Sequence, residues 1–210
     1  MKGDLRQIDY DHVETVLAMA RAGPGHSRAQ LPGLDVIRSF EWIRIAPVGF
    51  DRGAGRDFQV AVQVPGAVGL PRGGQVTFQL IGELIGSEAA VEPYARVGDE
   101  LDWQGLLSIC PPGTIGEDAI GRDNGCDLFE LRNWRPGDHY HAAGQSHDKK
   151  LKTLFQEGRI PLWERRHWPV LTCQGEMVWS RRFGPAATLA GRFGCFPLLR
   201  IIEIPEPALL

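Results

Sequence analysis

Residues 149–161 read KKLKTLFQEGRIP. The leucines and the phenylalanine of this stretch recur at the i, i+3, i+4 spacing of one helical face, and its glycine ends the pattern. Ser146 or Asp148 can cap the helix, which we expect to begin at residue 149. The proline that closes the stretch suits the first position of a second short helix, over residues 162–167. The stretch therefore predicts two short helices in succession.

Strand signals surround this helical pair on both sides. Runs that are rich in β-branched and aromatic residues, with Gly or Pro turns at their ends, predict strands. Gln174-Gly175 separates two of these runs and predicts a hairpin, and Pro32-Gly33 predicts a turn. The runs cover residues 35–45, 58–64, 75–81, 128–131, 170–173, 176–179 and 198–204.

A further helix is expected near the N-terminus, where Asp9 or Asp11 can serve as its cap. The apolar positions that follow are spaced as one buried helical face, formed by Val13, Val16, Leu17 and Ala20. Residues 111–125 are polar and rich in Gly and Pro, which indicates an exposed loop or an insertion.

These patterns predict an α+β protein of mostly antiparallel strands, with a small helical pair on one side. We expect three parts along the chain. Residues 1–110 form a connecting N-terminal helix followed by a β-meander, residues 111–126 form the loop or insertion, and residues 127–210 form a C-terminal domain.

The composition is that of an ordinary globular chain, with 43% hydrophobic and 23% charged residues among 210. The apolar stretches are far shorter than the roughly 20 residues of a membrane span, and the N-terminus lacks the apolar core of a signal peptide. The four cysteines show no Cys-x-x-Cys spacing, which is typical of reduced structural thiols. We therefore expect a cytoplasmic location and no membrane partner.

Charge is distributed unevenly along the chain. The formal net charge is −3, yet residues 132–182 hold ten Lys or Arg against five Asp or Glu. The excess within this segment is thus +5, and the remainder of the chain carries −8. Because local potential rather than net charge attracts a polyanion, this segment is the candidate for an anionic partner.

Lys149, Lys150 and Lys152 fall in the first turn of the expected helix, where the helix dipole disfavours cations. An anionic partner such as phosphate explains them, although a solvated charged face remains an alternative. Arginines and aromatic residues then alternate, a composition that can form a groove for phosphates and stacked bases. We expect Trp163, Trp168 and Trp179 to lie mostly in the core and the arginines to face solvent.

From residue 135 onward the sequence resembles the C-terminal domain of the tRNA(Ile)-lysidine synthase family. Ile8–Glu14 and Leu31–Gly33 resemble, more weakly, the segment that follows the catalytic region of that family. The stronger resemblance is carried by RPGD at 135–138, the stretch at 149–161, Arg165-Arg166, WPVL at 168–171, Val178-Trp179 and Phe183-Gly184.

The resemblance implies a layered β/β/α module, similar to one in the β chain of phenylalanyl-tRNA synthetase. It also implies an enzyme that uses ATP to adenylate the wobble cytidine of an isoleucine tRNA and then attaches lysine. The family's Ser-Gly-Gly-x-Asp-Ser loop does not occur in this sequence, so we expect the chain to be inactive alone and to contain no catalytic residue. ATP and Mg²⁺ are expected for the complete enzyme and not for this chain.

The implied partners are tRNA and a catalytic N-terminal domain, either covalently joined or separate, with a homodimer left open. His139 and His141 stand where the family more often has Arg, which weakens phosphate contact there because neutral imidazole is uncharged. Carried onto this chain, the candidate tRNA contacts are Arg135, Lys149, Lys150, Lys152, Arg159, Arg165 and Arg166.

Two other functions stay open from the sequence. One is a small metal-dependent hydrolase that uses His139, His141 and His147, although their spacing is less defined than in known zinc sites. The other is a protein-interaction module whose basic face docks an acidic partner. The sequence equally fits a fragment, a misread reading frame or a natural split subunit.

Overall fold

The computed structural model describes residues 7–23, 25–50, 57–71, 73–82, 99–109, 129–191 and 196–205. Its helices are α1 (Tyr10–Arg21), α2 (Trp103–Ile109), α3 (Leu151–Glu157) and α4 (Leu162–Arg165). Strands β1 to β7 span His26–Leu31, Leu34–Ser39, Trp42–Pro47, Gln59–Ala61, Gly66–Gly69, Gln75–Ile81 and Asp99–Asp102. Strands β8 to β14 span Phe129–Asn133, His139–Tyr140, Lys149–Lys150, Pro169–Cys173, Glu176–Ser180, Gly184–Pro185 and Leu198–Ile204.

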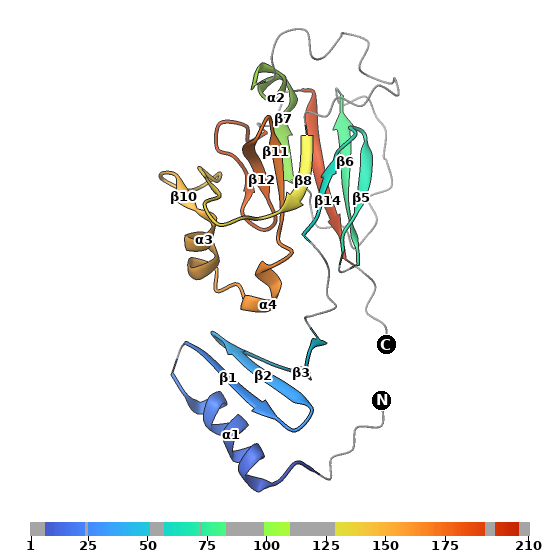
Figure 1. Cartoon of the computed structure of the whole chain (residues 1–210). Helices are drawn as coiled ribbons and strands as arrows, with labels where there is room; N and C mark the ends of the chain where they lie inside the picture. The colour runs from blue at the N-terminus through green and yellow to red at the C-terminus, as the bar shows by residue number, and fades with distance from the viewer. Residues whose placement is uncertain are drawn as a thin grey trace.

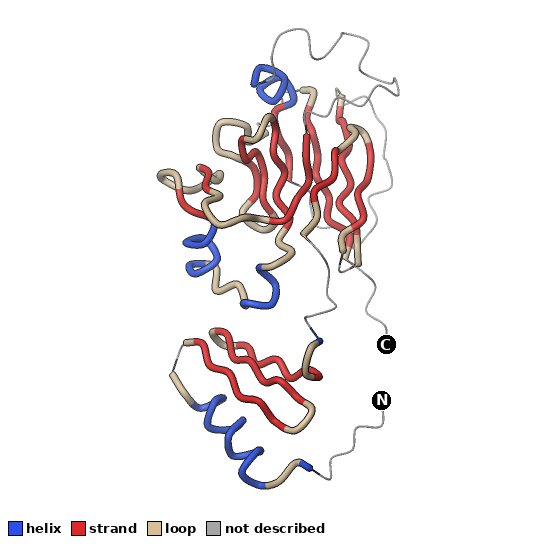
Figure 2. The backbone as a smooth tube through the Cα atoms, viewed as in Figure 1, coloured by secondary structure: helices blue, strands red, loops and turns tan. Residues whose placement is uncertain are grey.

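Every strand pairing in the described residues is antiparallel, which confirms a mixed α+β class made mostly of strands. At one end of the molecule, α1 contacts β1 and β2 of the meander β1-β2-β3 (Figure 1). At the other end lie two larger sheets, in the orders β13-β12-β11-β8-β4 and β5-β6-β14-β7 (Figure 2). None of the helices in these described ranges is long and apolar enough to cross a membrane.

The two larger sheets and α3 share one hydrophobic core. Phe78 of β6, Leu199 of β14 and Leu171 of β11 are fully buried in it, and so is Phe155 of α3. All five residues of β11 are buried, so both faces of this central strand are covered. Strands from both sides of the expected loop at 111–126 meet in these sheets, because β4 pairs with β8 and β14 pairs with β6 and β7.

Several expected elements appear within a residue or two. β6 and β14 have the predicted bounds, β11 and β12 form the predicted hairpin, and Pro32-Gly33 lies in the turn between β1 and β2. β8 continues two residues beyond the predicted strand, to Asn133. The predicted loop at 111–125 lies outside the described residues.

The strand predicted over residues 35–45 is instead two strands, β2 and β3, joined by a tight turn. Phe40 in this turn has a positive φ of 55°. An apolar residue in that conformation carries no turn signal, because glycine or asparagine usually takes the left-handed region. The strand predicted over 58–64 is also shorter, because the chain leaves β4 after Ala61 and enters the other sheet at β5.

The apolar face predicted for α1 is not buried. Asp9 does cap the helix, with its carboxylate accepting from the backbone N–H of His12, so the start of the helix is as expected. However, Val13 is 48% exposed and Leu17 37% exposed. Spacing predicts which residues share a helix face, whereas burial depends on the partner surface, and α1 has only a small sheet to pack against.

Candidate nucleic-acid interface

The turn at residues 135–138 fixes the start of the candidate interface. The Asp138 carboxylate accepts two hydrogen bonds from the Arg132 guanidinium, at 2.8 and 2.9 Å, and one from the Arg135 backbone N–H at 2.6 Å. Gly137 supplies a φ of 104° that side chains rarely adopt. The Asp138 backbone carbonyl accepts from the N–H of Leu151 at 2.8 Å, so the same turn anchors the first residue of α3.

The lysines lie differently from the sequence prediction. Lys149 and Lys150 form the short strand β10 against β9, and α3 begins only at Leu151. Lys150 is the N-cap residue and provides no side-chain cap, so the prediction of Ser146 or Asp148 as the cap was wrong. The bridge to β9 and the bond to Asp138 hold the chain extended until residue 150. Of the three lysines, only Lys152 is within the helix.

Burial of one face of α3 turns Lys152 outward. Leu151, Leu154 and Phe155 face the core, so Lys152 is exposed. Lys150 is exposed as well, and neither ammonium group forms an ion pair with a described residue. Lys149 differs from both, because its side chain is only 17% exposed and its ammonium group contacts both carboxylate oxygens of Glu157 at 2.8 and 2.9 Å.

Two arginines of the helical pair have different surroundings, Arg159 in the link between α3 and α4 and Arg165 at the end of α4. Arg159 has a φ of 49° and a side chain that is 64% exposed, and it forms an ion pair with Glu41 in the β2–β3 turn. Arg165 is only 8% exposed, and its Nε and Nη2 both donate to the Ile160 carbonyl, at 2.9 and 2.8 Å. Burial lowers the pKa of Arg165 from its usual value.

Aromatic rings enclose the Arg165 guanidinium. Its central carbon lies 5.7 Å from the ring centroid of Phe40 and 5.6 Å from that of Phe155. The cation therefore joins the β2–β3 turn to α3 from within the protein. In this structure Arg165 stabilises the fold, whereas its sequence neighbour Arg166 is exposed and forms no ion pair with a described residue.

The seven sequence-predicted contacts thus fall into three groups. Lys150, Lys152 and Arg166 are exposed cations on β10, on α3 and just after α4. In Figure 1, β10 and α3 lie at the left of the larger sheets, and α4 lies between these sheets and the β1–β3 meander. We call these three cations the basic ridge. Arg135 is also exposed, and its Nη2 donates to the neutral Gln59 side chain at 2.5 Å; no carboxylate of a described residue forms an ion pair with it. Lys149, Arg159 and Arg165 are engaged within the protein.

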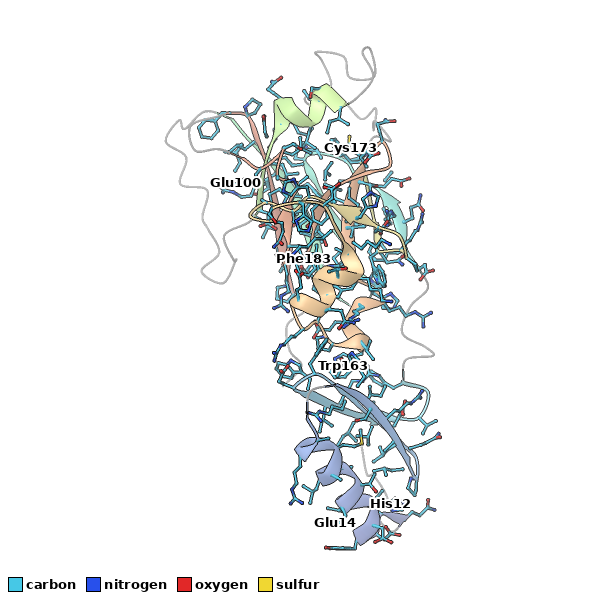
Figure 3. All side chains as sticks on the ribbon, turned by 90° about the vertical axis from the view of Figure 1, so that its left-hand side faces the viewer. His12, Glu14, Glu100, Trp163, Cys173 and Phe183 are labelled. Atoms are coloured by element: carbon cyan, nitrogen blue, oxygen red, sulfur yellow. The ribbon has the colours of Figure 1, made fainter. Side chains whose placement is uncertain are left out.

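Tryptophan positions agree in part with expectation. Trp168 and Trp179 are buried, with their ring N–H groups donating to Ser180 Oγ at 3.0 Å and to Asp99 at 2.6 Å. Trp163 is only half-buried and lies where the helical pair meets the β1–β3 meander, as Figure 3 shows. The Arg44 guanidinium lies 5.2 Å from its ring centroid. Sequence reasoning missed this contact, because no local pattern joins residues so far apart in the chain.

The histidines proposed for a metal site bind separate partners. A ring nitrogen of His139 contacts the Gly137 carbonyl at 3.0 Å, and one of His141 contacts the Gln145 carbonyl at 2.7 Å. His147 contacts the hydroxyl of Ser146 at 2.9 Å. Within the described ranges, no three His, Cys, Asp or Glu side chains are grouped as metal ligands. The metal-dependent alternative therefore gains no support from these residues.

Comparison with known proteins matches the segment that carries these residues to a protein family. Residues 129–192 match the TilS substrate C-terminal domain. The chain is 43% identical over 194 residues to a tRNA(Ile)-lysidine synthase of Solibacter usitatus, an alignment that covers 90% of this chain. It is 24% identical over 203 residues to the synthase of Geobacter sulfurreducens, covering 95% of this chain. In both cases the match spans 38% of the length of the relative.

A crystal structure of a TilS C-terminal domain is also similar, with a TM-score of 0.49, 19% identity, and coverage of 73% of this chain and all of that one. The matched residues 129–192 include all seven candidate contacts, from Arg135 to Arg166. From these matches in sequence, the chain belongs to the C-terminal portion of the tRNA(Ile)-lysidine synthase family.

Proposed function

We propose that this chain is the tRNA-binding C-terminal part of a tRNA(Ile)-lysidine synthase. The complete enzyme would ligate lysine to the wobble cytidine of an isoleucine tRNA at the expense of ATP. A catalytic N-terminal domain, joined or separate, would bind ATP and Mg²⁺, and we assign no residue of this chain to either. The role of this chain would be to hold the tRNA.

The observation that carries the proposal is the basic ridge. Lys150, Lys152 and Arg166 expose cations that no carboxylate of a described residue neutralises, within the residues that match the family domain. Such cations suit phosphates, because each neutralised phosphate releases counterions and adds affinity at low salt. Arg135 extends the proposed contacts, whereas Lys149 and Arg159 would first have to exchange a carboxylate for a phosphate.

A layered β/β/α arrangement of the C-terminal module, similar to the one in the phenylalanyl-tRNA synthetase β chain, belongs to the same proposal. The shared core of the two sheets and α3 supports it, as does the burial of both faces of β11. Such a module would present the helical side as a rigid surface. Phosphate contacts of this kind position a nucleic acid without reading its sequence.

Titration of the purified chain with isoleucine tRNA at several salt concentrations tests the proposal. Reversing the ridge with Lys150→Glu, Lys152→Glu and Arg166→Glu should weaken binding and flatten the salt slope by about 0.7–0.9 per lost phosphate contact. Arg21→Glu on α1 is the matched control, because it reverses one exposed arginine outside the ridge. Unchanged affinity and slope in the ridge variants would overturn the proposal, and binding to an acidic protein instead would favour a docking module.

A further inference from the structure

Strand β3 and the residues after it expose large aromatic side chains. Trp42 is 62% exposed, and Phe50 is 58% exposed. Trp42 and Arg44 are two residues apart on β3, so their side chains leave the same face of the strand. The Arg44 guanidinium lies 5.9 Å from the Phe50 ring centroid and 5.2 Å from that of Trp163. We call Trp42, Arg44 and Phe50 the aromatic patch.

The aromatic patch adjoins the helical pair that carries the basic ridge. The end of β2, next to the turn that leads into β3, is attached to the start of α4, because the Leu162 N–H donates to Ser39 Oγ at 3.1 Å. Glu41 in that turn pairs with Arg159, and Trp163 of α4 lies against Arg44. Figure 3 shows Trp163 at this junction. Arg44 of the aromatic patch therefore lies against α4, which ends one residue before Arg166.

A ligand for such a patch needs a flat apolar surface and an anionic group close together. An unpaired nucleotide has both, since its base can stack on an aromatic side chain while its phosphate contacts a cation. A base pair inside a duplex cannot stack in this way, because both of its faces are covered by neighbouring pairs. The combination of exposed rings with Arg44 and the nearby ridge thus favours single-stranded RNA.

We propose that the aromatic patch is a stacking site for an unpaired nucleotide of RNA, with Trp42 as the principal stacking side chain. This inference rests on the proposed function, because it adds a base-binding site to a surface proposed for phosphates. It assigns the ridge to the backbone of the RNA and the patch to a base outside the duplex. The two sites therefore respond differently to single-stranded and double-stranded probes.

Fluorescence anisotropy with a short single-stranded RNA and a blunt RNA duplex tests this division. Trp42→Ala should weaken single-stranded binding about 5- to 160-fold, which is the range of about 1–3 kcal/mol for loss of one stacked base, and leave duplex binding unchanged. Trp42→Phe should restore most of the affinity, because phenylalanine also stacks. Ile45→Ala is the matched control, since Ile45 is 54% exposed on the same strand but leaves the opposite face.

A second readout does not depend on how well the alanine variant folds. Stacking on a base quenches tryptophan emission, so single-stranded RNA should quench the wild-type chain more than the Trp42→Phe chain. Equal quenching, or equal single-stranded affinity of wild type and Trp42→Ala, overturns the stacking site. If the wild type binds the duplex but not the single strand, the stacking site fails while the proposed function stands; if it binds neither RNA nor tRNA, both fail.

Discussion

Replacing Arg165 with alanine should cost the protein about 2–4 kcal/mol of folding free energy. The wild-type guanidinium makes two hydrogen bonds to the Ile160 carbonyl, and bonds from a charged donor contribute about 1.5–3 kcal/mol. Its contacts with the rings of Phe40 and Phe155 contribute about 0.5–2 kcal/mol more. The alanine variant also avoids the free-energy cost of burying the guanidinium, and this gain reduces the net loss of stability to about 2–4 kcal/mol.

The neighbouring Arg166 provides the contrast. Arg166 is exposed and forms no ion pair with a described residue, so Arg166→Ala should change stability by no more than about 0.5 kcal/mol. The same variant should lower tRNA affinity and reduce the salt slope by about 0.7–0.9. Arg165→Ala is thus expected to lower mainly the melting temperature, and Arg166→Ala is expected to lower mainly the tRNA affinity.

Thermal melts and tRNA titrations of the two variants test this reasoning. For a chain of this size, 1 kcal/mol shifts the melting temperature by about 2–4 °C, so Arg165→Ala should melt about 5–15 °C lower. Arg165→Lys should recover only part of the loss, because an ammonium group cannot reproduce the planar fork. If Arg165→Ala melts like the wild type and loses as much tRNA affinity as Arg166→Ala, the assignment of Arg165 to the fold is refuted.

Glu41→Gln should raise tRNA affinity by up to about five-fold, because an exposed ion pair contributes at most about 1 kcal/mol, and Arg159→Gln should remove the gain. Equal affinities of wild type and Glu41→Gln in a filter-binding titration would contradict competition between Glu41 and phosphate. Burial, and to a smaller extent the charge of Asp99, raises the pKa of Tyr140 above its usual value, which favours the neutral phenol in the folded state. The stabilisation of the folded state that corresponds to this raised pKa is fully present below about pH 10 and is lost as pH rises through the raised pKa. As pH rises above about 10, the free energy of unfolding measured in urea should therefore fall less for Tyr140→Phe than for the wild type. Equal falls for the two chains would contradict this role of Tyr140. Incubation with EDTA should leave the melting temperature unchanged, since the described residues offer no group of three metal-ligating side chains; a drop that zinc reverses would point to a metal site instead.

The buried strands were predictable because alternating or continuous apolar runs between turn signals are local patterns. β6 and β14 have their predicted bounds for this reason, as does most of the β11–β12 hairpin. The start of α3 was not predictable in the same way. Its first residue is set by a bond from Leu151 to Asp138 and by the pairing of β10 with β9, and neither contact follows from the sequence near the helix.

The same limit applies to the candidate interface. The sequence identified the segment that holds the cations, and it placed Trp168 and Trp179 in the core. It could not separate Arg165 from Arg166, because the two have the same charge and are adjacent. Phe40, from a turn more than a hundred positions earlier, helps to enclose one of them and leaves the other in water.

The sequence by itself determined the α+β class, most strand positions, the family and the segment in which cations accumulate. The tertiary structure alone decided which of those cations remain exposed and which aromatic side chains lie beside them. The physical reason is that periodicity and composition are properties of a short stretch of chain. Burial and charge pairing depend instead on which distant segment packs against that stretch, as Glu41 does against Arg159.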